Sequence, residues 1–189
     1  MTMFFPQFST VALMAAGIVA GIPMEAPSAP NSKLHTVVVG SSNTSFLLFT
    51  PQEITAQPGD KVEFQFSQRN HTVTQSAFES PCEPIANAIN SGFVPTAANQ
   101  SMVTTFTMTV NGTAPMFMYC AQGKHCQAGM VFTINASNGT QNFGTYRAAA
   151  AKAAKNIPAA KVSGGVLGQI TAEKATTVPL RRRFKEHRA

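Results

Sequence analysis

The chain has 189 residues and a formal net charge of +6, with 44% hydrophobic residues, 14 Phe and no Trp. This length suits one domain with extensions and is too short for two domains with separate cores. The charge is uneven, because ten Lys and Arg stand against two Glu from Arg147 onward, whereas the preceding part has four basic and six acidic residues. The body is therefore mildly acidic, and the high isoelectric point does not indicate a nucleic-acid-binding domain.

The N-terminus predicts a removed secretory signal at residues 1–20, followed by a linker at 21–32. An apolar stretch from Val11 to Ile22 has about the length of a signal-peptide h-region and is too short to cross a bilayer. A retained anchor is the alternative, since no Lys or Arg precedes this stretch. No apolar segment closes the C-terminus, so we expect neither a membrane span nor a GPI signal.

Six Asn-x-Ser/Thr sequons agree with passage through a glycosylating compartment. They lie at Asn43, Asn70, Asn99, Asn111, Asn135 and Asn138. Such motifs also arise by chance in a chain rich in Thr and Asn. Together with the signal they predict a secreted protein, either extracellular or held in the cell wall.

Between residues 33 and 136 the chain predicts seven or eight short strands. The strand-like segments are the β-branched run 34–39, the apolar run 45–51, the alternating run 61–66 after a turn at 57–60, then 71–76, 102–110, 115–120 and 129–135. The interval 80–99 holds three prolines and no sustained period, so we expect a long excursion with at most one helical turn. This spacing predicts an all-β fold, a Greek-key sandwich.

The remainder, 137–189, is rich in Ala and Lys and is expected to be a mostly disordered tail with transient helix. It has no apolar stripe to dock, and Pro158 and Gly164-Gly165 interrupt it. The run Arg181-Arg182-Arg183 is expected to be a solvated charge cluster. Contact of this basic tail with acidic extracellular polymers, or its proteolytic trimming, is the alternative.

The stretch "CAQGKHCQAGM" brings together three side chains that bind soft metals. Cys120, His125 and Met130 follow one another at intervals of five residues. Cys120 ends one predicted strand, Met130 begins the next, and His125 lies in the joining loop. Such a hairpin can turn all three side chains toward one point at the end of a sandwich.

A fourth ligand has to come from elsewhere, and His71 is the better candidate. His187 lies in the tail and His35 in the first strand, whereas His71 follows a strand expected to run beside the C-terminal strands. One thiolate, two imidazoles and a weak axial thioether form a set that suits copper. A core histidine, a packing methionine and a zinc site remain alternatives, although Met is a poor zinc ligand.

The segments "HTVTQS", "PC", "GF" and "YCAQGKHCQAGMVF" resemble, in this order, the cupredoxin domain of secreted fungal extracellular serine-rich proteins. These are similar to phytocyanins and plastocyanins, and the match covers roughly 33–136. The resemblance implies a cupredoxin-like Greek-key β-sandwich or barrel with one type 1 copper ion. It also implies that the ligands are His71, Cys120, His125 and Met130.

The same resemblance implies a disulfide between Cys82 and Cys126, which leaves Cys120 as the free thiol that a copper thiolate requires. Asn70 lies in a sequon beside His71. Because a glycan there would crowd the copper, we expect Asn70 to be unmodified, with its amide hydrogen-bonding the ligand loops. The extension is basic instead of Ser-rich, which departs from the resemblance and puts surface anchoring in doubt.

The first functional hypothesis is a one-electron carrier that serves an unidentified redox partner protein. The second is a non-redox role, either copper sequestration or a structural or adhesive extracellular protein. The third is an enzyme such as a multicopper oxidase, whose trinuclear cluster needs His-x-His pairs. The sequence has no such pair and only four histidines, so we expect no catalysis.

Overall fold

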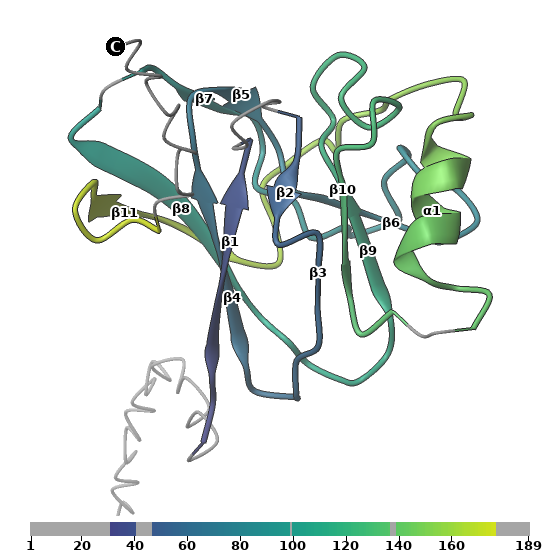
Figure 1. Ribbon diagram of the computed structural model, residues 1–189, viewed down its shortest axis with the longest axis horizontal. Helices are drawn as coiled ribbons and strands as arrows, with labels where there is room; N and C mark the ends of the chain where they lie inside the picture. The colour runs from purple at the N-terminus through teal and green to yellow at the C-terminus, as the bar shows by residue number, and fades with distance from the viewer. Residues whose placement is uncertain (1–30, 41–46, 99, 137–138, 177–189) are drawn as a thin grey trace, which may run out of the picture.

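The structure is a computed structural model that describes residues 31–40, 47–98, 100–136 and 139–176 (Figure 1). Its elements are β1 Leu34–Val39, β2 Phe49–Thr50, β3 Glu53–Ile54, β4 Lys61–Phe66, β5 Arg69–His71, β6 Thr74–Ser76, β7 Val94–Thr96, β8 Met102–Thr109, β9 Met116–Tyr119, β10 Val131–Ile134, α1 Phe143–Ala150 and β11 Val166–Thr171. The predicted signal (1–20), most of the linker, Asn43, Asn99, Asn138 and the Arg181–Arg183 run lie outside the described residues.

Two sheets face each other across the core, and a short strand pair closes one end. The larger sheet has the order β11-β8-β4-β1-β2, the smaller one the order β3-β10-β9-β6, and β5 pairs with β7. β1 runs parallel to β4 and β10 runs parallel to β3, while the other pairings are antiparallel. The predicted all-β sandwich is confirmed.

Alternating residues of β4 show why the sheets stack. Val62, Phe64 and Phe66 are fully buried, as their period of two requires for one face of a strand. The ring of Phe64 meets the ring of Phe132 from the opposite sheet edge-on, with centroids 5.5 Å apart. Phe49 packs against both rings, at 6.3 Å and 5.7 Å.

The prediction that the segment after residue 136 is disordered is wrong for its described part, 139–176. Helix α1 is capped by the Asn142 side chain, which accepts from the Thr145 backbone N–H at 2.9 Å. It buries Tyr146 and Ala150 against the smaller sheet, where the tilted rings of Tyr146 and Phe117 pack with their centroids 4.9 Å apart. The burial of one large aromatic residue, Tyr146, therefore holds α1 against the smaller sheet, although the helix has no apolar stripe.

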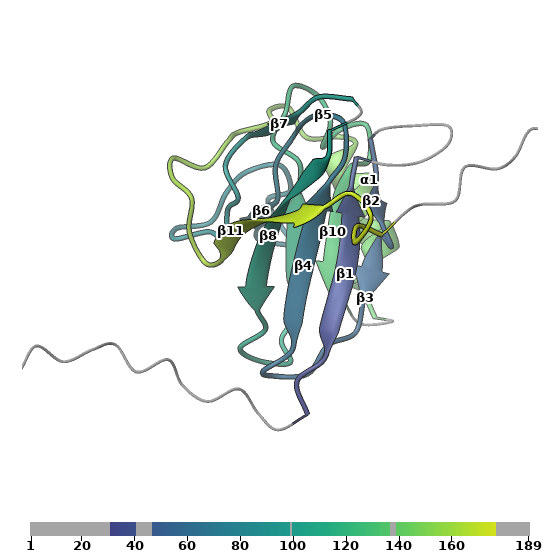
Figure 2. The same cartoon turned by 90° about the vertical axis from the view of Figure 1, so that its left-hand side faces the viewer.

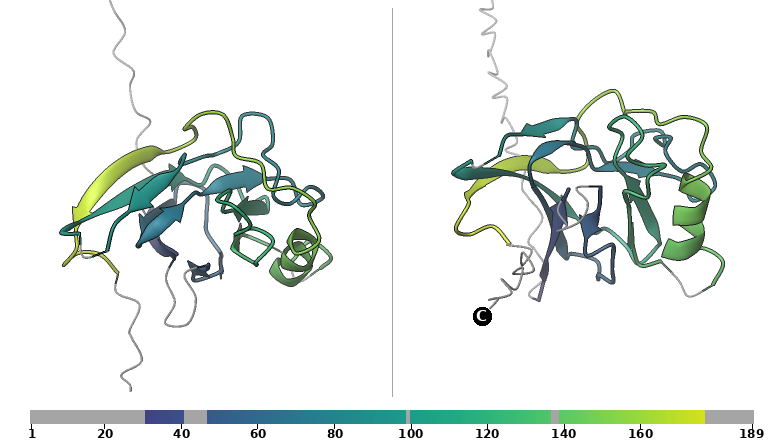
Figure 3. Two further views of the ribbon diagram at one scale, coloured as in Figure 1. Left: turned by 90° about the horizontal axis from the view of Figure 1, so that it is seen from above. Right: turned by 45° about the horizontal axis from the view of Figure 1, so that its top comes forward.

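Strand β11 joins the larger sheet beside β8, with six residue pairs in antiparallel register (Figure 2). Seen from above, α1 and β11 lie on opposite sides of the molecule, and the chain between them passes over the end of the sandwich (Figure 3). Because β11 is held by backbone hydrogen bonds to β8 and its residues are mostly exposed, its sequence carries no alternating pattern to detect.

The strand count among the described residues, eleven, exceeds the predicted seven or eight. The excess comes from short strands: 45–51 yields β2 alone, β3 follows it, and 71–76 contributes to β5 and β6. The excursion 80–98 has no helix, and β7 lies within it. Strands of two or three residues are too short for periodicity to reveal, and Pro95 lies inside β7. Among the described residues, no helix combines the length and apolar character needed to cross a bilayer.

Candidate metal centre

Three of the four predicted ligands converge at the end of the sandwich closed by β5 and β7. His71 ends β5, Cys120 follows directly after β9, and His125 lies in the next loop. One ligand atom from each residue lies within 4.8 Å of the others. Sγ of Cys120 is 3.4 Å from Nδ1 of His125 and 3.8 Å from Nδ1 of His71. Two histidines that are 54 positions apart in the chain thus present the same ring nitrogen to one sulfur.

Gly40 makes room for the His71 ring. A Cβ atom at Gly40 would lie 2.3 Å from Nε2 of His71, and the φ angle of Gly40 is +91°. Both the space and the backbone conformation therefore require glycine. Gly40, which directly follows β1, therefore packs closely against the imidazole of His71, which is fully buried.

The Cys120 thiol is fully buried and accepts hydrogen bonds from backbone N–H groups. The Thr72 N–H donates to Sγ at 3.3 Å, and the Thr72 hydroxyl accepts from the Ala121 N–H at 2.7 Å. Burial raises the pKa of Cys120 to about 11, and the backbone hydrogen bonds from Gln122 and then Thr72 work against that rise. Without a cation the sulfur therefore holds its proton at neutral pH, and metal binding would have to displace it.

Both imidazoles are neutral at physiological pH. Burial, and then the nearby His125, lower the pKa of His71 to about 4. Burial, and then the charge of Arg69, also lower the pKa of His125. Neutral imidazole is the ligand form of histidine. A buried soft sulfur between two neutral imidazoles fits copper in its donor chemistry.

Met130 is tied to both neighbouring ligand residues through its backbone. Its N–H donates to the His125 carbonyl at 2.9 Å, and its carbonyl accepts from the Cys120 N–H at 3.1 Å. The Met130 side chain is fully buried at the start of β10. Met130 as the fourth ligand beside His71, Cys120 and His125 stays a prediction.

The structure contains the disulfide between Cys82 and Cys126, with Cα atoms 5.8 Å apart, and leaves Cys120 as a free, buried thiol. Cys126 directly follows His125, and Cys82 lies in the excursion after β6. The bond therefore fastens the ligand loop to the excursion.

Asn70 also contacts the ligand loop. Its Nδ2 donates to Oε1 of Gln122 at 3.0 Å. The amide thus hydrogen-bonds the ligand loop, and the absence of a glycan at Asn70 stays a prediction. Of the other described sequons, Asn135 exchanges two hydrogen bonds with the Ala56 backbone, at 2.8 Å and 3.0 Å, whereas Asn111 is exposed.

His35 is excluded from the cluster by its position and by its partner. It lies beside Val62 at the start of β4, and its Nε2 is 2.9 Å from Oδ2 of Asp60. The choice of His71 over His35 agrees with this arrangement.

Sequence reasoning did not identify three residues that support the site, namely Gly40, Thr72 and Asn156. Asn156 lies in the segment expected to be disordered, yet its Nδ2 donates to the carbonyls of Cys120 and Gly123, each at 3.0 Å. The only available signal was the break of the Ala/Lys run at Asn156-Ile157-Pro158.

A β-sandwich with a His-Cys-His cluster at one end defines a cupredoxin-like protein, and sequence comparison agrees. The chain is 31% identical over 136 residues to a protein of the fungus Arthroderma benhamiae (strain ATCC MYA-4681 / CBS 112371) named "Probable GPI-anchored cupredoxin-1". The match covers 72% of this chain and 70% of that protein. The chain therefore belongs to the cupredoxin family. No family model matches it.

A second protein of the same fungus, named "Extracellular serine-rich protein", is 36% identical over 133 residues. The match covers 70% of this chain and half of that relative. Among solved structures, native pseudoazurin from Hyphomicrobium denitrificans is similar, with a TM-score of 0.42 and 17% identity over 65% of this chain and 99% of that chain.

Proposed function

We propose that the chain is a secreted type 1 copper-binding protein that carries one electron. The observation that carries this proposal is the convergence of Cys120 Sγ with one nitrogen each of His71 and His125 in a buried position. Membership of the cupredoxin family supports it. Met130 would complete the proposed ligand set with its thioether sulfur.

Bound copper would supply a centre that alternates between Cu(I) and Cu(II). The protein's part is to hold three donors in one arrangement for both oxidation states. Hydrogen bonds and the disulfide restrain the loop between Cys120 and Met130 from several sides, as described above. His71 is fully buried, whereas His125 is only partly buried. We propose the His125 edge as the route by which an electron reaches a partner protein.

The extracellular location follows the names of both relatives. We propose that the signal at 1–20 directs this secretion. The redox partner is an unidentified protein, and contact of the basic C-terminal residues with acidic polymers of the wall is a further part of the proposal. The sequence lacks the His-x-His pairs of a trinuclear copper cluster, so we propose no catalytic role.

The test is titration of the purified, metal-free protein with Cu(II), followed by visible absorption. We expect an intense thiolate-to-copper band that Cys120→Ser abolishes and His71→Gln weakens or shifts. His35→Gln is the matched control, because His35 faces Asp60 at the other end of β1, and it should leave the band intact. A wild-type protein that stays colourless with its Cys120 thiol reduced would contradict the proposal.

Copper sequestration is the second candidate function, since the same buried ligands would serve it. Voltammetry of the copper-loaded protein separates the two. Reversible one-electron cycling with an unchanged spectrum supports an electron carrier. Loss of the metal on reduction, or absence of a reversible wave, supports sequestration.

A further inference from the structure

The segment that links α1 to β11, residues 151–165, crosses the metal end of the sandwich and is called here the strap. Figure 3 shows it running above the ends of the strands. Asn156 lies within the strap. Its side-chain nitrogen Nδ2 donates to the carbonyls of Cys120 and Gly123, each at 3.0 Å. An amide nitrogen has two N–H groups, so both are used on one loop.

These two acceptors bracket the start of the ligand loop. Cys120 is the thiol ligand candidate at the end of β9, and Gly123 turns the chain with a φ of +50° two positions before His125. A group that fixes both carbonyls fixes the distance between them and hence the path from the sulfur to the imidazole.

The strap is anchored closely on both sides of Asn156. The Ile157 N–H donates to the carbonyl of Cys82 at 2.9 Å, and the Tyr119 hydroxyl donates to the Ile157 carbonyl. Gln127 Nε2 reaches the carbonyl of Ala153 at 3.4 Å. Asn156 is therefore held against β9 and beside the disulfide, independently of its own bonds to the loop.

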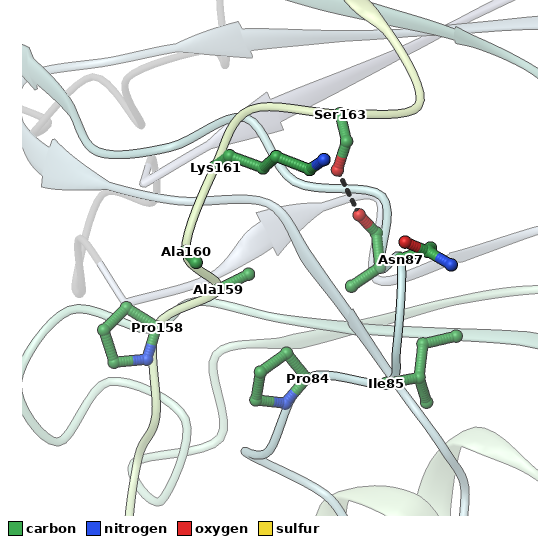
Figure 4. A pocket seen from close by; sticks show the side chains of 9 residues that line it. Pro84, Ile85, Asn87, Pro158, Ala159, Ala160, Lys161 and Ser163 are labelled. Carbon is green, nitrogen blue, oxygen red and sulfur yellow. Dashed lines mark hydrogen bonds between the residues drawn. The ribbon is translucent and has the colours of Figure 1, made fainter.

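Both ends of the strap are also fixed. Upstream, the Tyr146 hydroxyl of α1 lies 2.6 Å from the Ser76 hydroxyl in a buried contact. Downstream, Ser163 and Asn90 exchange two backbone hydrogen bonds of 2.9 Å. Figure 4 shows this stretch beside Pro84 and Ile85, with the Ser163 hydroxyl donating to the Ala88 carbonyl.

From these contacts we infer that Asn156 is a positioning residue for the metal centre, acting through the backbone carbonyls of Cys120 and Gly123. The inference rests on the proposed copper function and extends it to the C-terminal segment. The orientation of the Asn156 amide matters, because the carbonyls of Cys120 and Gly123 accept hydrogen bonds and cannot donate them. An oxygen in place of Nδ2 would face two acceptors without a proton to share.

Asn156→Asp tests this with almost no change in side-chain volume, since it removes both donors and adds a negative charge. Asn156→Ala removes the donors without the charge and serves if the aspartate variant does not fold. Asn111→Asp is the matched control, with the same chemical change in an exposed turn after β8. All variants are made in the full chain.

The first measurement is amide hydrogen exchange in the metal-free protein. Two lost hydrogen bonds should speed exchange of residues 121–125 by about tenfold or more, with β4 and β8 unchanged. The second is the absorption maximum and the reduction potential of the copper-loaded protein, both of which should shift in the two Asn156 variants. Asn111→Asp should move none of these values.

The outcomes separate the two proposals. Exchange rates equal to those of wild type in both Asn156 variants overturn the positioning role. Faster exchange with an unchanged absorption maximum and reduction potential also overturns it, because that result indicates a merely structural contact. If wild-type protein binds no copper, the proposed function fails, and the exchange of residues 121–125 in the metal-free variants alone decides whether Asn156 positions the loop.

Discussion

The two ends of the sandwich each hold a histidine, and the two histidines meet different partners. At the start of β1 and β4, His35 lies 2.9 Å from the Asp60 carboxylate. Beyond the other end of β4, His71 meets the thiol of Cys120 and a second imidazole. The first histidine has a carboxylate as its partner within the chain. The second lies in a group of neutral donors that a cation could complete.

The ends also differ in how they are constrained. The Asp60 end depends on hydrogen bonds from Lys33, His35 and Gln57. The metal end has a disulfide, a glycine fitted against an imidazole and the strap. Donor atoms in a metal site have to keep fixed positions even before the metal binds, whereas the buried Asp60 carboxylate already has its hydrogen-bond donors in place. The following changes test this contrast, from the largest expected effect to the smallest.

Removal of the disulfide should have the largest effect. The double variant Cys82→Ser with Cys126→Ser, which avoids creating a new thiol near Cys120, is expected to lower the free energy of unfolding by about 2–5 kcal/mol. The bond closes a loop of 44 residues, so its loss enlarges the unfolded ensemble. Urea unfolding of the metal-free protein measures this. An unfolding free energy equal to that of wild type would show that the bond does not constrain the metal end.

Gly40→Ala should come next. The new methyl group would lie 2.3 Å from Nε2 of His71 on a backbone with φ of +91°, so we expect a loss of about 1–3 kcal/mol and a weaker, shifted copper band. Urea unfolding and absorption measure the two effects.

The control for Gly40 is Gly112→Ala in the turn at the Asp60 end, where a Cβ would meet nothing within 4 Å. It should change neither stability nor the band appreciably. Equal losses in both glycine variants would contradict the special role of Gly40.

Low pH should destabilise the Asp60 end of the sandwich. The backbone N–H groups of Gln57 and Lys33, and then His35, lower the pKa of Asp60 from 3.8 to about 2. A carboxyl group with a depressed folded-state pKa contributes its stability above the unfolded pKa and loses it as the pH falls through the folded value. The contribution of Asp60 is thus present above about pH 4 and lost between pH 4 and 2.

Unfolding measured from pH 6 to pH 2 checks this for wild type and Asp60→Asn. The difference between the two proteins should shrink as the pH falls through that window. A difference that stays constant over the whole range would show that the carboxylate charge contributes nothing at this end.

Glycosylation should have the smallest effect on the folded domain. Of the described sequons, Asn111 is exposed in the turn near Asp60, whereas the amides of Asn70 and Asn135 are hydrogen-bonded. Peptide mass spectrometry of the secreted protein should find a glycan on Asn111 and none on Asn70 or Asn135. The copper band should be the same with and without the Asn111 glycan. A glycan on Asn70 in copper-loaded protein would contradict the role assigned to that side chain.

Much of the sandwich could be predicted from residue order. The run 34–39 is β1 and the run 61–66 is β4, because β-branched residues and strict alternation specify strands locally. The short strands β3 and β7, and the longer strand β11, could not be predicted in this way, since their partners, not their own composition, hold them in place.

The sequence by itself determined which side chains could serve as soft ligands, because Cys120 and His125 lie on one hairpin and their spacing fixes their proximity. His71 could be proposed as a partner, although only the tertiary structure brings its Nδ1 within 3.8 Å of a sulfur that is 49 positions later in the chain. The order of the described C-terminal segment, 139–176, was decided entirely by tertiary structure. Its Ala/Lys composition has no docking stripe, and the energy that orders it comes from the buried Tyr146, from pairing with β8 and from carbonyls of the ligand loop that accept from Asn156.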